Sequence, residues 1–195
     1  MALFVLVIAG TAHAQFVHVS NCRIITQRGS YVVINNINAT ASNAVPIPGG
    51  GSACILITTD FVTLNLAGFA ITGSNVSSGI ATDSVDRSGI HVHSGTVANF
   101  SDIGVNLHGN GHTIEQIRAV NNLGGGISVF GSITAKQGHR VLGNTAISNG
   151  DFGINVACPA VVLGNVAAGN GAGSAPEQIV VGFTACTRQE NSPSP

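Results

Sequence analysis

The sequence predicts an all-β protein, a right-handed parallel β-helix whose short strands stack into a solenoid of about six to eight coils. Three observations predict this fold. A four-residue strand motif recurs along the chain, asparagine and glycine repeats keep a fixed distance from that motif, and the composition favours strands and turns over helices.

The strand motif is a glycine followed by an apolar, a variable and a second apolar residue. It occurs at residues 89–92, 104–107, 126–129 and 153–156, as GIHV, GVNL, GISV and GINV. Within each motif apolar residues alternate with a period of two, which is typical of a short strand with one buried face.

Asparagine and glycine residues repeat in phase with these motifs. Asn122 and Asn149 each lie four residues before the glycine of the third and the fourth motif, and an octapeptide that begins at Gly143 recurs in similar form from Gly164. Asparagine tolerates the left-handed backbone of a tight corner, and stacked asparagines form hydrogen-bonded ladders. We therefore expect these residues at the corners of successive coils.

Alternating segments at residues 62–66 and 113–117 supply further strands. Their apolar side chains would stack on the same residue types in the next coil. An antiparallel sandwich or barrel is the alternative, because it also uses many short strands joined by turns. That alternative explains the alternation but not the shared phase of the repeats.

The composition argues against charge-driven partners. Only 8% of the residues are charged, and the formal net charge is −1. A chain with so little positive charge has no electrostatic attraction to nucleic acid or to anionic membranes, so we expect neither as a partner. No linker divides residues 15–195, which we interpret as a single β-helix domain.

Residues 1–14 form a predicted signal peptide. An apolar run from Ala2 to Ala9 is followed by small residues and an Ala-His-Ala ending before Gln15. No Lys or Arg precedes the run, so an N-terminal buried strand is the alternative. No later segment approaches the roughly 20 apolar residues of a membrane span. We expect a secreted, periplasmic or cell-surface protein.

The four cysteines form an even set in a chain predicted to be exported, which favours disulfides. They are Cys22, Cys54, Cys158 and Cys186, and three pairings are possible. Two cysteines lie near each end of the chain, which suggests local bridges from Cys22 to Cys54 and from Cys158 to Cys186.

The repeats also resemble those of a known family. Residues 22–73, with GSYVV, then CILI, then VTLNLAGFAITG, resemble the opening coils of bacterial right-handed parallel β-helix repeat proteins of the pectate-lyase-like superfamily, and the later repeats resemble their continuing coils. The resemblance implies the fold and a carbohydrate substrate or ligand. Members of this superfamily include polysaccharide lyases, hydrolases, epimerases and proteins without known catalysis, so it assigns no reaction.

Catalytic candidates are few, because the eight carboxylates are scattered and form no D-x-D or D-D pair. One grouping joins Asp83 to charged residues from consecutive coils, and His91 lies nearby as a possible base. The candidate catalytic residues are Asp86, Arg87, His91, Asp102 and Arg118. The alternative is a solvated surface with an ion pair. The sequence does not decide whether the protein is an enzyme.

Histidines form the second candidate group. His91 and His93 share one strand face, and His108 and His112 flank a turn one coil later. Convergence of the four imidazoles would create a zinc or copper site. The alternative is a polar strand surface, and no other feature indicates a cofactor.

Two functions follow as hypotheses. The first is an exported β-helix that binds or modifies an extracellular polysaccharide. The second is a non-catalytic structural or surface-interaction β-helix, favoured by the few carboxylates and the absence of tryptophan. We expect the phenylalanines, including Phe69, Phe100 and Phe130, to point into the core, which leaves no aromatic platform for a sugar.

Overall fold

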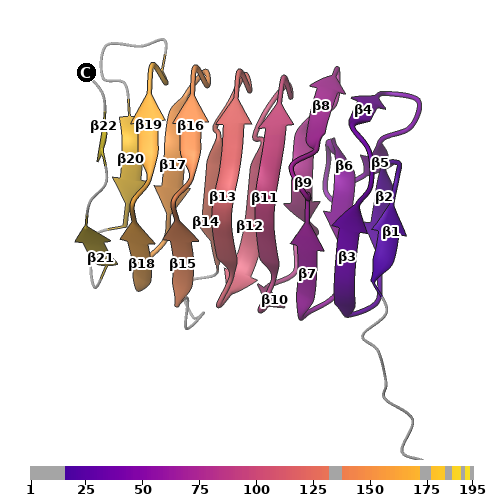
Figure 1. The fold of residues 1–195 in the computed structure, drawn as a ribbon, viewed down its shortest axis with the longest axis horizontal. Coiled ribbons are helices and arrows are strands. Elements are labelled where there is room, and N and C mark those ends of the chain that lie inside the picture. The colour runs from indigo at the N-terminus through magenta and orange to yellow at the C-terminus, as the bar shows by residue number, and fades with distance from the viewer. Residues whose placement is uncertain (1–15, 132–137, 172–176, 183–185, 190–191, 194–195) are drawn as a thin grey trace, which may run out of the picture.

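The computed structural model describes residues 16–131, 138–171, 177–182, 186–189 and 192–193. These residues contain strands and turns and no helix. The strands stack side by side along a rod, with the N-terminal strands at one end and the C-terminal strands at the other (Figure 1). The predicted signal peptide lies outside the described residues.

The strands form two sheets. Sheet 1 has 13 strands, namely β1 (Val17–Val19), β3 (Gly29–Val33), β4 (Ile37–Thr40), β7 (Val62–Asn65), β8 (Ala70–Ser74), β11 (His91–Ala98), β13 (Thr113–Val120), β15 (His139–Leu142), β16 (Thr145–Ile147), β18 (Ala160–Leu163), β19 (Val166–Ala168), β21 (Cys186–Gln189) and β22 (Ser192–Pro193). Sheet 2 has nine strands, namely β2 (Arg23–Ile25), β5 (Val45–Pro46), β6 (Ser52–Ile57), β9 (Ser78–Thr82), β10 (Arg87–Ser88), β12 (Val105–Asn110), β14 (Ile127–Phe130), β17 (Phe152–Val156) and β20 (Glu177–Val181).

Strands that lie one coil apart in the sequence pair in parallel, as a β-helix requires. The main path of sheet 1 stacks eight strands and that of sheet 2 stacks seven. Within the described residues the only antiparallel pair is β5 with β6. The parallel pairing confirms the predicted β-helix and excludes an antiparallel sandwich.

The core lies between the sheets and consists of stacked aliphatic side chains. One column in sheet 2 contains Ile55, Ile80, Val105, Ile127 and Ile154, all fully buried. Like side chains one coil apart pack directly on each other because parallel strands are about 4.8 Å apart. The strand motifs at 104–107, 126–129 and 153–156 supply the last three residues of this column, whereas the motif at 89–92 belongs to sheet 1.

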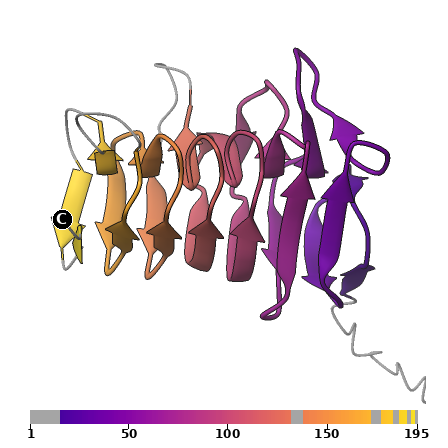
Figure 2. The ribbon, with the colours of Figure 1, turned by 90° about the horizontal axis from the view of Figure 1, so that it is seen from above.

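Buried asparagines form ladders at the corners, as the repeats predicted. The Asn149 carboxamide oxygen accepts hydrogen bonds from the backbone N–H and the side chain of Asn122, and its nitrogen donates to the Asn170 oxygen at 2.8 Å. Asn144 and Asn165 form a second ladder in the same way. Seen from above, the turns that connect the strands stack in line (Figure 2). The ladders thus satisfy polar backbone groups that no strand pairing reaches.

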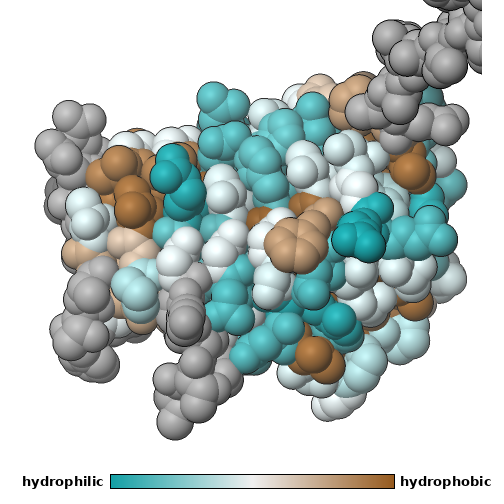
Figure 3. All heavy atoms as spheres, turned by 90° about the horizontal axis from the view of Figure 1, so that it is seen from below, coloured by the Kyte–Doolittle hydropathy of each residue, from teal (hydrophilic) through white to brown (hydrophobic). Residues whose placement is uncertain are grey.

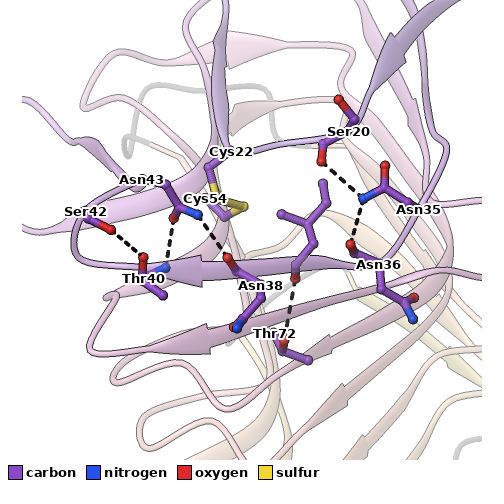
Figure 4. The surroundings of a disulfide bond; sticks show 11 residues. Ser20, Cys22, Asn35, Asn36, Asn38, Thr40, Ser42, Asn43, Cys54 and Thr72 are labelled. Carbon is purple, nitrogen blue, oxygen red and sulfur yellow. Dashed lines mark hydrogen bonds between the residues drawn. A yellow bond between two sulfur atoms is a disulfide. The ribbon is translucent and has the colours of Figure 1, made fainter.

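Both predicted disulfides are present, Cys22–Cys54 and Cys158–Cys186. Figure 4 shows the first bridge beside the turn in which the Asn43 side chain hydrogen-bonds Thr40 and Asn38. The first bridge joins neighbouring coils at the N-terminal end of the solenoid, and the second joins neighbouring coils at its C-terminal end. Disulfides persist in oxidising environments, so they indicate a non-cytoplasmic compartment.

Candidate functional site

A groove on the outer face of sheet 2 is hollowed beside strands β9, β12 and β14. Its volume is about 500 Å³. It is lined by Ile47, Pro48, Gly50 and Gly51 of the arm formed by residues 45–51, by strand side chains and by two acidic turns. The arm packs on the outer face of the sheet through Val45 and Ile47, which cover Leu56 and Ala81. The antiparallel β5–β6 pair therefore forms one wall of the groove.

Ion pairs hold the turn that follows β9. The guanidinium of Arg87 donates two hydrogen bonds to the carboxylate of Asp83, and this contact raises the pKa of Arg87. The Asp86 carboxylate lies 2.7 Å from Nδ1 of His108. The turn is anchored to β12 because Arg87 pairs with Gly109. Two of the three groove-side aspartates are thus matched to a basic group.

Asp102 has a different environment. It lies on the loop before β12 and lines the groove together with Asp83 and Asn106. Partial burial raises the pKa of Asp102, and the negative charge of Asp151 one coil away raises it further.

Phe130 gives the groove an aromatic wall. The prediction that it points into the core is wrong, because its side chain lies on the outer face and is 40% exposed. Its ring meets the His108 ring edge to face, with centroids 4.7 Å apart. The period of two in β14 contains this information, since Ile127 and Val129 point inward and Phe130 follows them out of phase. Phe100 is buried, as expected.

His91 and His93 lie on the outer face of sheet 1, where Glu115 joins them. Their rings stack with centroids 4.5 Å apart, and Nε2 of His91 is 2.9 Å from Oε1 of Glu115. One possible ligand atom from each of the three residues lies within 4.8 Å of the others. Partial burial lowers the pKa of His93, the His91 imidazole lowers it further, and Glu115 acts in the opposite direction.

His112 belongs to the core. It is fully buried, its Nδ1 accepts a hydrogen bond from the backbone of Ile90, and its ring stacks on that of His139, with centroids 5.3 Å apart. The backbone N–H of His112 donates in turn to Nδ1 of His139. Burial lowers the pKa of His112 to about 4 and that of His139 to about 3. These two histidines form a neutral ladder like those of the asparagines.

The candidate residues therefore separate into distinct places. Asp86, Arg87, Asp102 and His108 gather at or beside the groove of sheet 2, while His91 and His93 gather with Glu115 on sheet 1. Arg118 is exposed on β13 of sheet 1, in register with Thr96 and Thr145, and does not line the groove. The four histidines at 91, 93, 108 and 112 do not converge.

Polar side chains cover much of the middle of the rod, and apolar ones gather toward its C-terminal end on the face seen from below (Figure 3). The described residues include no helix long and apolar enough to cross a membrane. Comparison of the chain with models of protein families, with curated proteins and with solved structures finds no match.

Proposed function

We propose that the protein binds a neutral polysaccharide in the groove of sheet 2. The observation that carries this proposal is the exposed ring of Phe130 beside polar groups. Sugars present an apolar C–H face and a rim of hydroxyls, so a protein binds them by stacking an aromatic ring on that face and hydrogen-bonding the rim. Asp83, Asp102 and Asn106 line the same groove and supply carboxylate and carboxamide groups for such hydroxyls.

The charges of the groove favour a neutral sugar over a uronic acid. Asp83 is neutralised by Arg87, and Asp86 lies against His108. Asp102 has another aspartate, Asp151, as its charged neighbour. An anionic uronate would meet this negative charge at close range, and like charges in partly desolvated surroundings repel. A neutral polymer meets no such penalty.

Binding without bond cleavage fits the ion pairs better than hydrolysis does. Two-carboxylate hydrolysis needs one acid and one free base or nucleophile on either side of the scissile bond. In the groove Asp83 is held in an ion pair by two hydrogen bonds from Arg87, so it is not a free base or nucleophile, while its remaining lone pairs can still accept hydrogen bonds from hydroxyls. A structural or surface-interaction β-helix is the second candidate, supported by the same scarcity of free carboxylates.

The wider assignment follows from the sequence resemblance. We infer an exported, right-handed member of the pectate-lyase-like superfamily, secreted, periplasmic or on the cell surface. The two disulfides and the parallel solenoid support this inference. The resemblance also supplies the carbohydrate ligand class, which the groove residues make more specific.

The test is a binding screen with a matched control. Wild-type protein, Phe130→Ala and Phe61→Ala are titrated with neutral and uronic oligosaccharides by calorimetry. Phe61 is 61% exposed and does not line the groove, so it controls for loss of any exposed aromatic ring. We expect binding of at least one neutral oligosaccharide, weakened about tenfold or more in Phe130→Ala, since full burial of a Phe side chain contributes about 1.5–3 kcal/mol. Binding of no saccharide, or equal binding by all three proteins, would overturn the proposal.

A further inference from the structure

His91, His93 and Glu115 form a compact polar cluster on the outer face of sheet 1, on the opposite side of the core from the groove. We propose that these three side chains bind one divalent transition-metal ion, with Zn²⁺ as the ion that suits their donor atoms. This site goes beyond saccharide binding and uses none of the groove residues.

Strand register brings the three donors together. His91 and His93 are two residues apart on β11, so both point outward from the sheet, and Glu115 lies directly opposite His93 on β13. Donor atoms bound to one tetrahedral ion at Zn–N and Zn–O distances of 2.0–2.1 Å lie about 3.3 Å apart. The His91 and Glu115 atoms are already 2.9 Å apart, and all three donors lie within 4.8 Å. Small side-chain rotations would therefore close the site.

The hydrogen bonds around His93 leave its metal-binding nitrogen available. The Ser94 hydroxyl donates its hydrogen to Oε1 of Gln116, which is an acceptor only, at 3.2 Å. The contact of 3.0 Å between Ser94 Oγ and Nδ1 of His93 must then be donated by the imidazole. Neutral His93 consequently carries its lone pair on Nε2. Histidine ligands are held in this way by a partner on the other ring nitrogen.

The backbone that supports the cluster is fixed. Ser94 and Gln116 lie side by side on β11 and β13, and both have left-handed backbones, with φ of 61° and 54° respectively. The carbonyl of His93 accepts a hydrogen bond of 2.9 Å from the backbone of Leu66, and that of Ser94 accepts one of 2.7 Å from Gly68. The bend thus holds the hydroxyl of Ser94 beside the imidazole that it orients.

The donor set and its exposure select the kind of ion. Two imidazoles and one carboxylate are a typical ligand set of zinc sites with a fourth position open to water, whereas Ca²⁺ takes six to eight oxygens. The side chains of His91 and Glu115 are 32% and 35% exposed, so solvent reaches the cluster. An ion bound there would keep at least one exchangeable water.

The test is zinc uptake by the folded, tag-free protein. Isothermal titration with ZnSO₄ is carried out on the wild type and on His93→Ala and Glu115→Gln. The controls are His18→Ala, an exposed histidine on the same sheet, and His108→Ala in the groove. We expect one Zn²⁺ per chain, an affinity lowered more than about tenfold in the two cluster variants, and unchanged affinity in both controls.

A second measurement distinguishes ligation from nonspecific adsorption. Co²⁺ added in place of Zn²⁺ should give the visible absorption of a tetrahedral nitrogen and oxygen site in the wild type and lose it in His93→Ala, while far-ultraviolet circular dichroism shows that both remain folded. Absence of zinc uptake, uptake that persists in both cluster variants, or equal loss in His108→Ala would overturn the proposal. Saccharide binding is unaffected by either result, because its residues lie on the other sheet.

Discussion

Removal of the Asn149 carboxamide should cost a large part of the folding free energy. The side chain is 2% exposed, and its oxygen accepts from the backbone N–H of Asn122 at 3.1 Å and from the Asn122 side chain at 2.9 Å. Asn149→Ala therefore leaves two buried donors without this acceptor. Each unsatisfied buried donor costs about 1–3 kcal/mol, so we expect a loss of about 2–6 kcal/mol. Whole domains are stable by only about 5–15 kcal/mol.

An isosteric variant separates hydrogen bonding from space filling. Asn149→Asp keeps the shape and the acceptor for Asn122, but it turns an oxygen toward the Ala119 carbonyl and the Asn170 oxygen, to which the native amide donates at 3.1 and 2.8 Å. Two acceptors then face each other, and a buried carboxylate lacks a cation. We expect this variant to be at least as unstable as Asn149→Ala.

Urea unfolding followed by circular dichroism measures both losses. Asn155→Ala is the matched control, because Asn155 lies on the outer face of β17 beside Ser128, and its loss should change stability by less than about 0.5 kcal/mol. The reasoning is refuted if Asn149→Ala is no more destabilising than Asn155→Ala, or if Asn149→Asp is as stable as the wild type.

Three further predictions follow from the fold. Burial lowers the pKa of His112 to about 4 and that of His139 to about 3, below the 6.5 of the unfolded chain. The free energy of unfolding therefore has its full value above pH 6.5 and falls as the pH drops, because only the unfolded chain takes up protons. In His112→Asn/His139→Asn the slope of the free energy of unfolding against pH, measured near pH 5, should be lower by up to about 2.7 kcal/mol per pH unit. Cys22→Ala/Cys54→Ala, which opens a 32-residue loop, should lower the free energy of unfolding by about 3.7 kcal/mol in urea titrations, and an unchanged midpoint would contradict the end-clamp role. Gly109→Ala should lower the melting temperature, and Gly111→Ala should lower it less. A Cβ at Gly109 would lie 1.8 Å from the Arg87 carbonyl oxygen, whereas a Cβ at Gly111 would have no heavy atom within 4 Å. Equal shifts of the melting temperature would count against this contact.

The repeats predict most of the fold because each coil buries the same residue types at equivalent positions. Period-two strands and phase-locked asparagines specify which residue stacks on which, so Asn122 above Asn149 follows from spacing alone. The sheet to which a strand belongs does not follow, since turns of unequal length change the phase. The motif at 89–92 resembles the other three and yet lies in sheet 1.

The grouping of the candidate site residues could not be predicted, because it depends on the sheet to which each strand belongs. His91, His93, His108 and His112 lie within 22 residues, but two sheets and the core separate them. Glu115 escapes a motif search because it meets His93 only across neighbouring strands. The outward position of Phe130 was available from strand alternation, whereas the arm beside β5 that walls the groove carries no repeat to predict its position.

The structure separates members of both candidate groups that the sequence suggested, because His108 lies at the groove while His91 and His93 lie on sheet 1. The groove of sheet 2 combines an aromatic ring with acidic and amide groups, and sheet 1 presents imidazoles with a carboxylate. Phe130, Asn106 and the three cluster residues of sheet 1 lie on strands, whereas Asp83 and Asp102 lie in the turns beside them. Sites on strands are positioned more accurately than sites on loops.

A crystal structure with a neutral oligosaccharide from the binding screen tests the central claim most directly. We expect a sugar ring in van der Waals contact with the face of Phe130, at about 4 Å, with hydroxyls hydrogen-bonded to Asp83, Asp102 or Asn106. A sugar bound elsewhere on the solenoid, with the Phe130 groove filled only by solvent, would contradict it.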